Sequence, residues 1–217
     1  GPWPRSRARM CGVPLRRVCG RRRWPRSWSA GNLQPRHSNS VRIIAGDWRG
    51  RRLRFPDSVG LRPTPDRTRE TLFNWLGQRL DGQRCLDLFA GSGALGIEAA
   101  SRGAAEVVLV EHDARVAAAL RASVALLDAA ARVRVEQADA LAFLARAGAG
   151  YDLIFLDPPF AAGLLPRVIE EAATCLLPGG RIYAESGNPD AVRTVAGLAV
   201  RREARAGKSY SFLLERA

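Results

Sequence analysis

The chain has 217 residues, of which 47% are hydrophobic and 25% charged, a composition typical of one globular domain with its own core. No apolar run approaches the ~20 residues that a membrane-spanning helix needs. Four scattered cysteines without a C-x-x-C pair are too few for a disulfide scaffold, so we expect a cytoplasmic protein. The formal net charge is +13, and residues 1–40 contain ten arginines and no acidic residue, so this segment carries most of the charge.

Residues 1–40 also differ from the rest of the chain in composition. They combine Pro, Gly, Ser and Arg with no apolar period and no stretch long enough for the core of a signal peptide. Such segments bury too little apolar surface to fold, so we predict a disordered basic tail. An arm that contacts RNA and an organelle transit peptide are alternatives.

Residues 41–80 predict a small N-terminal extension made of a β-hairpin and a helix. Two strand-like runs, 41–45 and 51–55, flank a loop that contains glycine. A helix is expected to follow, with Thr64 as its cap and Pro65 in its first position. Three leucines spaced four residues apart indicate its buried face: Leu72, Leu76 and Leu80.

Residues 81–217 alternate between strand-like and helical stretches. Strands are expected at 84–89, 106–111, 132–137, 151–156 and 181–185, and helices at 94–101, 113–127, 140–146 and 164–176. Two final runs, 198–205 and 208–215, predict an antiparallel hairpin. This order predicts an α/β fold with an open, mainly parallel sheet that ends in a C-terminal antiparallel hairpin.

A glycine-rich turn follows the first strand of that sheet. The stretch DLFAGSGALG fits the G-x-G-x-x-G pattern of a nucleotide-binding turn, with Gly91 and Gly93 as its first glycines. Glu111 ends the next strand, where a carboxylate can accept hydrogen bonds from both ribose hydroxyls. Asp139, beside Ala140, could accept one from an adenine amino group. NAD and S-adenosylmethionine share these groups, so this pattern leaves the cofactor open.

Asp87 begins to separate the two cofactors. S-adenosylmethionine carries a sulfonium and an ammonium group, which a carboxylate beside the turn would stabilise. NAD would place a pyrophosphate there, and a carboxylate would repel it. Asp87 therefore favours S-adenosylmethionine, and an aspartate that only braces the turn is the structural alternative.

The stretch LDPPF ends the fourth strand and indicates chemistry on a nucleobase. An exocyclic amino group is a poor nucleophile because its lone pair is delocalised into the ring. Asp157 and the carbonyl of Pro158 could accept its two N–H bonds and direct the lone pair at a methyl donor, while Phe160 offers a surface for stacking. Positioning does most of this work, so we expect no metal.

Together these stretches resemble a known family. DLFAGSGALGIEAASRGA with LDPPF is similar to class I S-adenosylmethionine-dependent N-methyltransferases, and VRIIAGDWRGRRLRFP followed by RPTPDRTRETLFNWL resembles the RsmD family. The resemblance implies a Rossmann-like methyltransferase fold with a seven-stranded sheet, and S-adenosylmethionine as cofactor. It further implies methylation of N2 of a guanine, at position 966, in bacterial 16S ribosomal RNA. The site would then comprise cofactor-binding residues (Asp87, Gly91, Gly93, Glu111, Asp139 and Ala140) and catalytic residues (Asp157, Pro158 and Phe160).

Arginines are concentrated ahead of the glycine turn. Guanidinium groups suit phosphate, so the basic hairpin and the segment after it are expected to contact RNA. The predicted RNA-binding residues are Arg42, Arg49, Arg51, Arg52, Arg54, Arg62 and Arg67, with Arg69 close behind them. A solvated charged face is the alternative.

The favoured hypothesis is a monomeric methyltransferase that acts on 16S ribosomal RNA, within an assembling 30S particle. The same acceptor geometry would serve DNA adenine-N6 methylation, although no target-recognition domain is evident. A non-catalytic RNA-binding assembly factor is a third possibility. An NAD dehydrogenase ranks last, because no proton-donor motif accompanies the glycine turn.

Overall fold

The main sheet has seven strands in the order β5-β4-β3-β6-β7-β9-β8. The computed structural model describes residues 39–58, 61, 63–159, 163–193, 195 and 197–216. The strands are β3 Arg84–Asp87, β4 Glu106–Glu111, β5 Val133–Gln137, β6 Tyr151–Leu156, β7 Leu176–Ser186, β8 Leu198–Ala206 and β9 Ser209–Arg216. Strands β3 to β7 pair in parallel, and β9 lies antiparallel between β7 and β8. The predicted fold class is confirmed, including the C-terminal hairpin.

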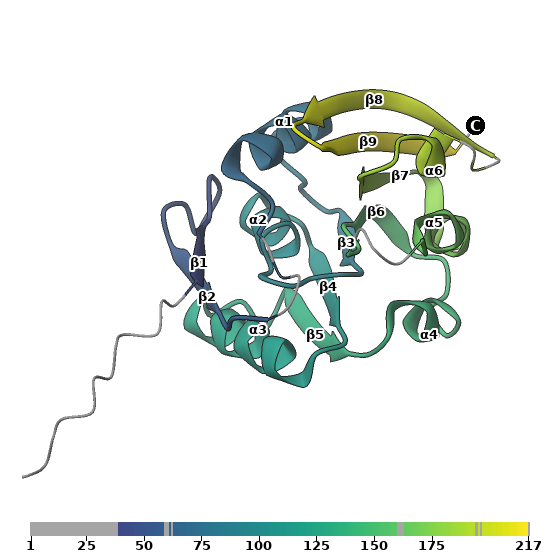
Figure 1. Cartoon of the computed structure of the whole chain (residues 1–217). Coiled ribbons are helices and arrows are strands. Elements are labelled where there is room, and N and C mark those ends of the chain that lie inside the picture. Colours follow the sequence, from purple (N-terminus) through teal and green to yellow (C-terminus); the bar gives the residue numbers. More distant parts are fainter. Residues whose placement is uncertain are drawn as a thin grey trace, which may run out of the picture. The chain divides into compact units, whose positions relative to one another are not determined.

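Helices cover both faces of this sheet (Figure 1). One face packs against α1 Asp66–Leu76, α2 Gly96–Ser101 and α3 Ala114–Leu126, and the other against α4 Ala140–Leu144, α5 Leu165–Thr174 and α6 Asp190–Arg193. Successive strand residues alternate between two core clusters: Cys85 faces the α1 side and Leu86 the α4 side. Both faces are therefore buried, and a ligand must bind at the carboxyl edge of the parallel strands.

The N-terminal extension begins with a separate two-stranded antiparallel sheet, β1 Asn39–Arg42 and β2 Arg52–Phe55. Its buried side consists of Val41, Leu53 and Phe55, which join the core cluster on the α1 side. The predicted hairpin is therefore confirmed, although β1 begins two residues earlier than expected. The rest of the predicted 1–40 tail lies outside the described residues.

Helix α1 begins later than predicted, and Thr64 is not its cap. The N-cap residue is Pro65, which makes no side-chain capping bond, and the Thr64 hydroxyl is directed to Asp157 instead. The helix ends at Leu76 because Gly77 takes a left-handed conformation. Leu80 lies beyond the helix but is buried, as its apolar character predicts.

The largest shift in a predicted boundary is in β7. The strand was expected at 181–185 but begins at Leu176. It includes Gly179 and Gly180, and its register against β6 shifts near Tyr151. No helix among the described residues is long and apolar enough to span a membrane.

Candidate active site

Four neighbouring strands place an acidic residue at the carboxyl edge of the sheet. In spatial order they are Glu111 on β4, Asp87 on β3, Asp157 directly after β6 and Glu185 on β7. Each follows, by two residues, a side chain of the core cluster on the α1 side, so the alternation of strand side chains directs all four to that side. The fold thus gathers a row of carboxyl groups from residues far apart in sequence.

The glycine turn after β3 has a backbone conformation that requires glycine-like freedom at two positions. Gly91 and Gly93 have φ angles of 50° and 77°, in the left-handed region that glycine adopts without strain. A Cβ at Gly91 would lie 2.7 Å from Cδ1 of Leu61, and one at Gly93 would lie 2.7 Å from Cδ1 of Ile97. At both positions a Cβ would add steric contact to the strain of a positive φ, so the turn favours glycine.

The carboxylates next to this turn also brace the backbone. Glu111 accepts hydrogen bonds from the backbone N–H groups of Gly91 (3.0 Å) and Asp113 (2.8 Å). Asp139 caps α4 by accepting the N–H of Ala142 at 2.9 Å, and Ala140 begins that helix. The predicted cofactor-binding residues therefore lie along one edge, held by local bonds that orient them.

Asp87 is buried, and its carboxylate accepts the N–H of Gly96 at 3.0 Å. Burial raises its pKa to about 7; the bond from Gly96 opposes this rise, while the charges of Asp157 and Glu111 add to it. Negative charges are thus crowded at this edge, which suits a cationic ligand. A pyrophosphate would increase the repulsion, so the site fits S-adenosylmethionine better than NAD.

Asp157 is half-buried at the end of β6, and Pro158 beside it is buried. One oxygen of Asp157 accepts a hydrogen bond from the Thr64 hydroxyl at 3.2 Å. Burial raises the pKa of Asp157 to about 6, against the lowering effect of that bond. Phe160, the third predicted catalytic residue, lies outside the described residues.

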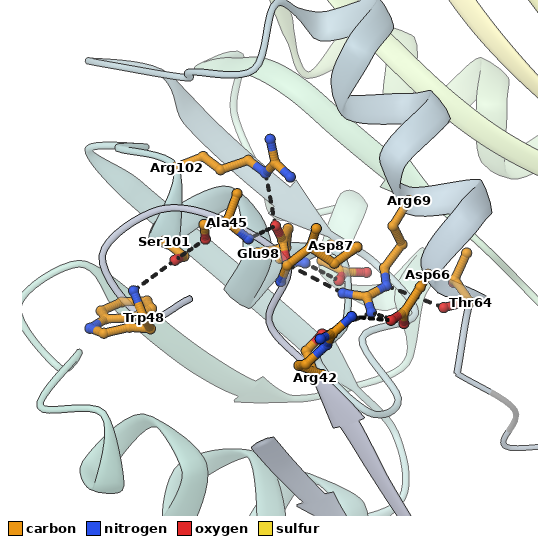
Figure 2. A network of polar contacts seen from close by, with 12 residues as sticks. Arg42, Ala45, Trp48, Thr64, Asp66, Arg69, Asp87, Glu98, Ser101 and Arg102 are labelled. Carbon is orange, nitrogen blue, oxygen red and sulfur yellow. Dashed lines mark hydrogen bonds and ion pairs between the residues drawn. The ribbon is translucent and has the colours of Figure 1, made fainter. Parts of the chain in front are cut away.

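A buried ionic network ties the N-terminal extension to the glycine turn (Figure 2). Glu98 of α2 accepts backbone N–H bonds from Ile44 (2.8 Å) and Ala45 (3.0 Å) of the hairpin. Its carboxylate also pairs with Arg69 of α1 at 3.3 Å and with Arg102 at 2.8 Å, and all three side chains are almost completely buried. Buried ion pairs and hydrogen bonds therefore connect the N-terminal extension to α2, the helix that follows the glycine turn.

The arginines ahead of the glycine turn divide into two sets. Arg69 is 1% exposed and belongs to this network, so its grouping with the RNA-contacting arginines is wrong. The exposed set consists of Arg42, Arg49, Arg51, Arg52, Arg54 and Arg67. Arg62 lies outside the described residues.

Three of the exposed arginines share the outer face of the hairpin. The register pairs Arg42 with Arg52, and Arg54 lies two residues further along the same face. Arg42 and Arg52 border a groove of about 370 Å³ whose other wall includes Thr64. The groove therefore leads from the basic face of the hairpin to the residue that contacts Asp157.

Comparisons with known proteins identify the family. Residues 41–215 match the family described as "Conserved hypothetical protein 95". Ribosomal RNA small subunit methyltransferase D of Escherichia coli K12 is 46% identical over 188 residues, which are 84% of this chain and 94% of that protein. The chain belongs to the RsmD family.

Solved structures of related proteins agree with this assignment. "Putative methyltransferase yhhF" of Escherichia coli is 45% identical with a TM-score of 0.75, and the match covers 82% of this chain and 98% of that one. A putative methylase of Haemophilus influenzae is 36% identical with a TM-score of 0.70, covering 82% and 99%. As a member of this family the chain is a methyltransferase with a Rossmann-like fold, and its methyl donor is S-adenosylmethionine.

Sequence reasoning missed two residues of the site and one contact between its parts. Glu98 is an acid within the small and apolar run GIEAA, a signal that could have marked it as a buried partner of basic groups. Glu185 ends a predicted strand, so it could have joined the other strand-end acids. The contact between Thr64 and Asp157 joins residues 93 positions apart, and no local pattern reveals it.

Proposed function

We propose that this member of the RsmD family methylates the exocyclic N2 of a guanine in small-subunit ribosomal RNA. The observation that carries the proposal is the position of Asp157: it follows β6, which pairs with the strand that leads into the glycine turn, and it bonds Thr64, which lines the groove beside Arg42 and Arg52. The named substrate of the relatives supports the RNA class. The resemblance described above supports guanine 966 as the target.

The residues at the carboxyl ends of β3, β4 and β5 are proposed to hold S-adenosylmethionine. Asp87 would compensate the positive charges of its methionyl end, Glu111 would accept from the ribose, and Asp139 with Ala140 would border the adenine. Gly91 and Gly93 would shape the turn against which the cofactor lies. When bound, the cofactor supplies an electrophilic methyl carbon whose bond to sulfur breaks with both electrons remaining on sulfur.

Asp157 is proposed to act on the target amino group. Its carboxylate accepts one N2–H hydrogen bond, the Pro158 carbonyl accepts the other, and this localises the nitrogen lone pair for attack on the methyl carbon. The nitrogen then loses one proton, which the Asp157 carboxylate can accept. Phe160 is proposed to stack on the extruded base.

The hairpin is proposed to bind the RNA backbone. Arg42 and Arg52 lie directly opposite each other, and Asp66, which lines the same groove, pairs with Arg42 at 3.5 Å. An RNA phosphate would bind both guanidinium groups and hold the RNA strand above the groove that includes Thr64. We accordingly propose that residues 41–80 form the RNA-binding extension of a catalytic domain at 81–217, which acts as a cytoplasmic monomer on an assembling 30S particle.

Labelled methyl transfer tests the proposal. The purified chain and S-adenosylmethionine are incubated with naked 16S RNA, 30S particles lacking the modification, or duplex DNA of matched length. Transfer to one of the RNA substrates, absent with Asp157→Ala and retained with the exposed-acid control Glu171→Ala, is expected. Transfer to DNA alone would contradict the proposal and favour adenine-N6 chemistry.

A further inference from the structure

The Thr64 hydroxyl serves Asp157, not the helix that follows it. The residue is buried and directly precedes the N-cap of α1, yet its hydroxyl donates to an oxygen of Asp157 at 3.2 Å. The Thr64 hydroxyl thus bonds a carboxylate 93 positions away and does not cap α1. Contacts from other parts of the fold hold Thr64 in this position.

Arg69 holds the backbone of Thr64 in place. Its Nε donates to the Thr64 carbonyl at 3.2 Å, and its other nitrogens contact Asp66 (2.6 Å), the Arg42 carbonyl (2.8 Å) and Glu98 (3.3 Å). These contacts use the fork-shaped donor set of one buried guanidinium group (Figure 2). Thr64 is therefore anchored to α2 and to the RNA-facing hairpin together.

A second carboxyl group lies beside Asp157. The register pairs Leu156 of β6 with Ala184 of β7, so the next residues, Asp157 and Glu185, are neighbours at the same edge. Glu185 is 5% exposed; its Oε1 accepts the Tyr183 hydroxyl at 2.8 Å, and the Ser209 hydroxyl lies 3.5 Å from its Oε2.

The two carboxyl groups occupy different environments. Burial, followed by the charge of Asp157, raises the pKa of Glu185 to about 8, whereas Asp157, to which Thr64 donates, has a pKa of about 6. The other titratable groups that act on this pair are Asp87 on β3 and Tyr183 on β7. The Thr64 bond favours the ionised form of Asp157, whereas burial and the charge of Asp157 favour the protonated form of Glu185, against the lowering effect of the bonds from Tyr183 and Ser209.

We propose that Thr64 is a positioning residue that keeps Asp157 ionised and oriented as the acceptor for the target amino group, while Glu185 keeps the proton of the pair. The role in transfer rests on the proposed function, in which Asp157 accepts one N2–H hydrogen bond and then the proton that N2 loses. A protonated Asp157 is a weaker acceptor and cannot take up that proton. Arg69 and Glu98 transmit the position of the hairpin to this hydroxyl.

The direct test is the titration of Asp157 by carbon-13 NMR of its side-chain carboxyl, assigned by loss of the signal in Asp157→Asn. It needs no RNA, so it is independent of the proposed substrate. Thr64→Val removes the hydroxyl at nearly constant volume, and Thr64→Ser is the matched variant that keeps it. A lost bond to a charged group corresponds to about one pKa unit. We expect the Asp157 pKa to rise by about one unit in Thr64→Val and to stay at its wild-type value in Thr64→Ser.

The second readout is the pH profile of methyl transfer to RNA under single-turnover conditions. The acidic limb is expected near pH 6 in the wild type and Thr64→Ser, and about one unit higher in Thr64→Val, with cofactor affinity unchanged within about twofold. Glu185→Gln mimics the protonated acid and should leave the Asp157 titration in place.

Two results would overturn the inference. An Asp157 titration that is the same in Thr64→Val and in the wild type would show that the hydroxyl does not tune this carboxyl. A fall of one unit or more in Glu185→Gln would show that Glu185 carries the charge. Failure of the proposed function has a different signature, the absence of methyl transfer to RNA by the wild-type chain, and leaves the NMR result to decide the inference.

Discussion

The two halves of the carboxyl edge are built in different ways. On the β3–β4 side, Asp87, Gly91 and Glu111 lie within 25 residues of one another and bond mainly to their own turn. On the β6–β7 side, Asp157 depends on Thr64 from the N-terminal extension and lies beside Glu185 from the next strand. The cofactor half is thus a local motif, while the base half is assembled by tertiary structure. This difference predicts distinct consequences of substitution in the two halves.

The largest expected effect is on the base side. Asp157→Ala should lower the rate of methyl transfer by about 10³-fold or more, because it removes the acceptor that orients the amino group. S-adenosylmethionine should still bind within about threefold of the wild type by calorimetry. Loss of cofactor binding in this variant would show that the two halves are not separate.

A substitution on the cofactor side should reverse this pattern. Asp87→Asn keeps an acceptor for the Gly96 N–H but removes the charge, so the dissociation constant for S-adenosylmethionine should rise about 10- to 100-fold. Asp128→Asn is a suitable control, because Asp128 is exposed and its φ of 52° is one that Asn tolerates. Wild-type affinity in Asp87→Asn would contradict the charge argument.

The basic hairpin should affect RNA binding alone. Arg42→Ala with Arg52→Ala should raise the KM for RNA about five- to tenfold at moderate salt and make the dependence of log affinity on log salt shallower by about 1 to 2. The double control Arg121→Ala with Arg167→Ala removes two exposed arginines from α3 and α5. Equal losses in both pairs would indicate a nonspecific charge effect.

The pH dependence of stability should report the crowded carboxyl groups. The pKa values of Asp87, Asp157 and Glu185 are raised to about 7, 6 and 8, so the folded state keeps protons that the unfolded chain releases. Their stabilising contribution is complete below about pH 4 and is lost as the pH rises through 6 to 8.

Without cofactor, the thermal midpoint should therefore fall by several degrees between pH 5 and 8.5, and less so in Asp87→Asn. The gain from saturating S-adenosylmethionine should be larger at pH 8 than at pH 6, because the cation then meets ionised partners. Scanning calorimetry measures the thermal midpoint at each pH. A midpoint that rises between pH 5 and 8.5 would contradict the account.

The sequence predicted the fold well because strand and helix periods are local properties. It also located Asp87, Glu111 and Asp157, since acids at strand ends meet at one edge in this architecture. Prediction from sequence failed where contacts between residues far apart in the chain determine the role of a side chain. Thr64 precedes a helix as a capping residue would, but its hydroxyl bonds Asp157. Arg69 lies two residues after Arg67 in the same basic stretch, although only Arg69 is buried against Glu98.

The measurement that tests the central claim most directly is a comparison of the modified nucleosides of 16S ribosomal RNA in cells with and without this chain, followed by mapping of the position. We predict that N2-methylguanosine at one position is lost without the chain and is restored by the wild type but not by Asp157→Ala. An unchanged guanine pattern, or loss of a methyl group from a different atom, would contradict the account.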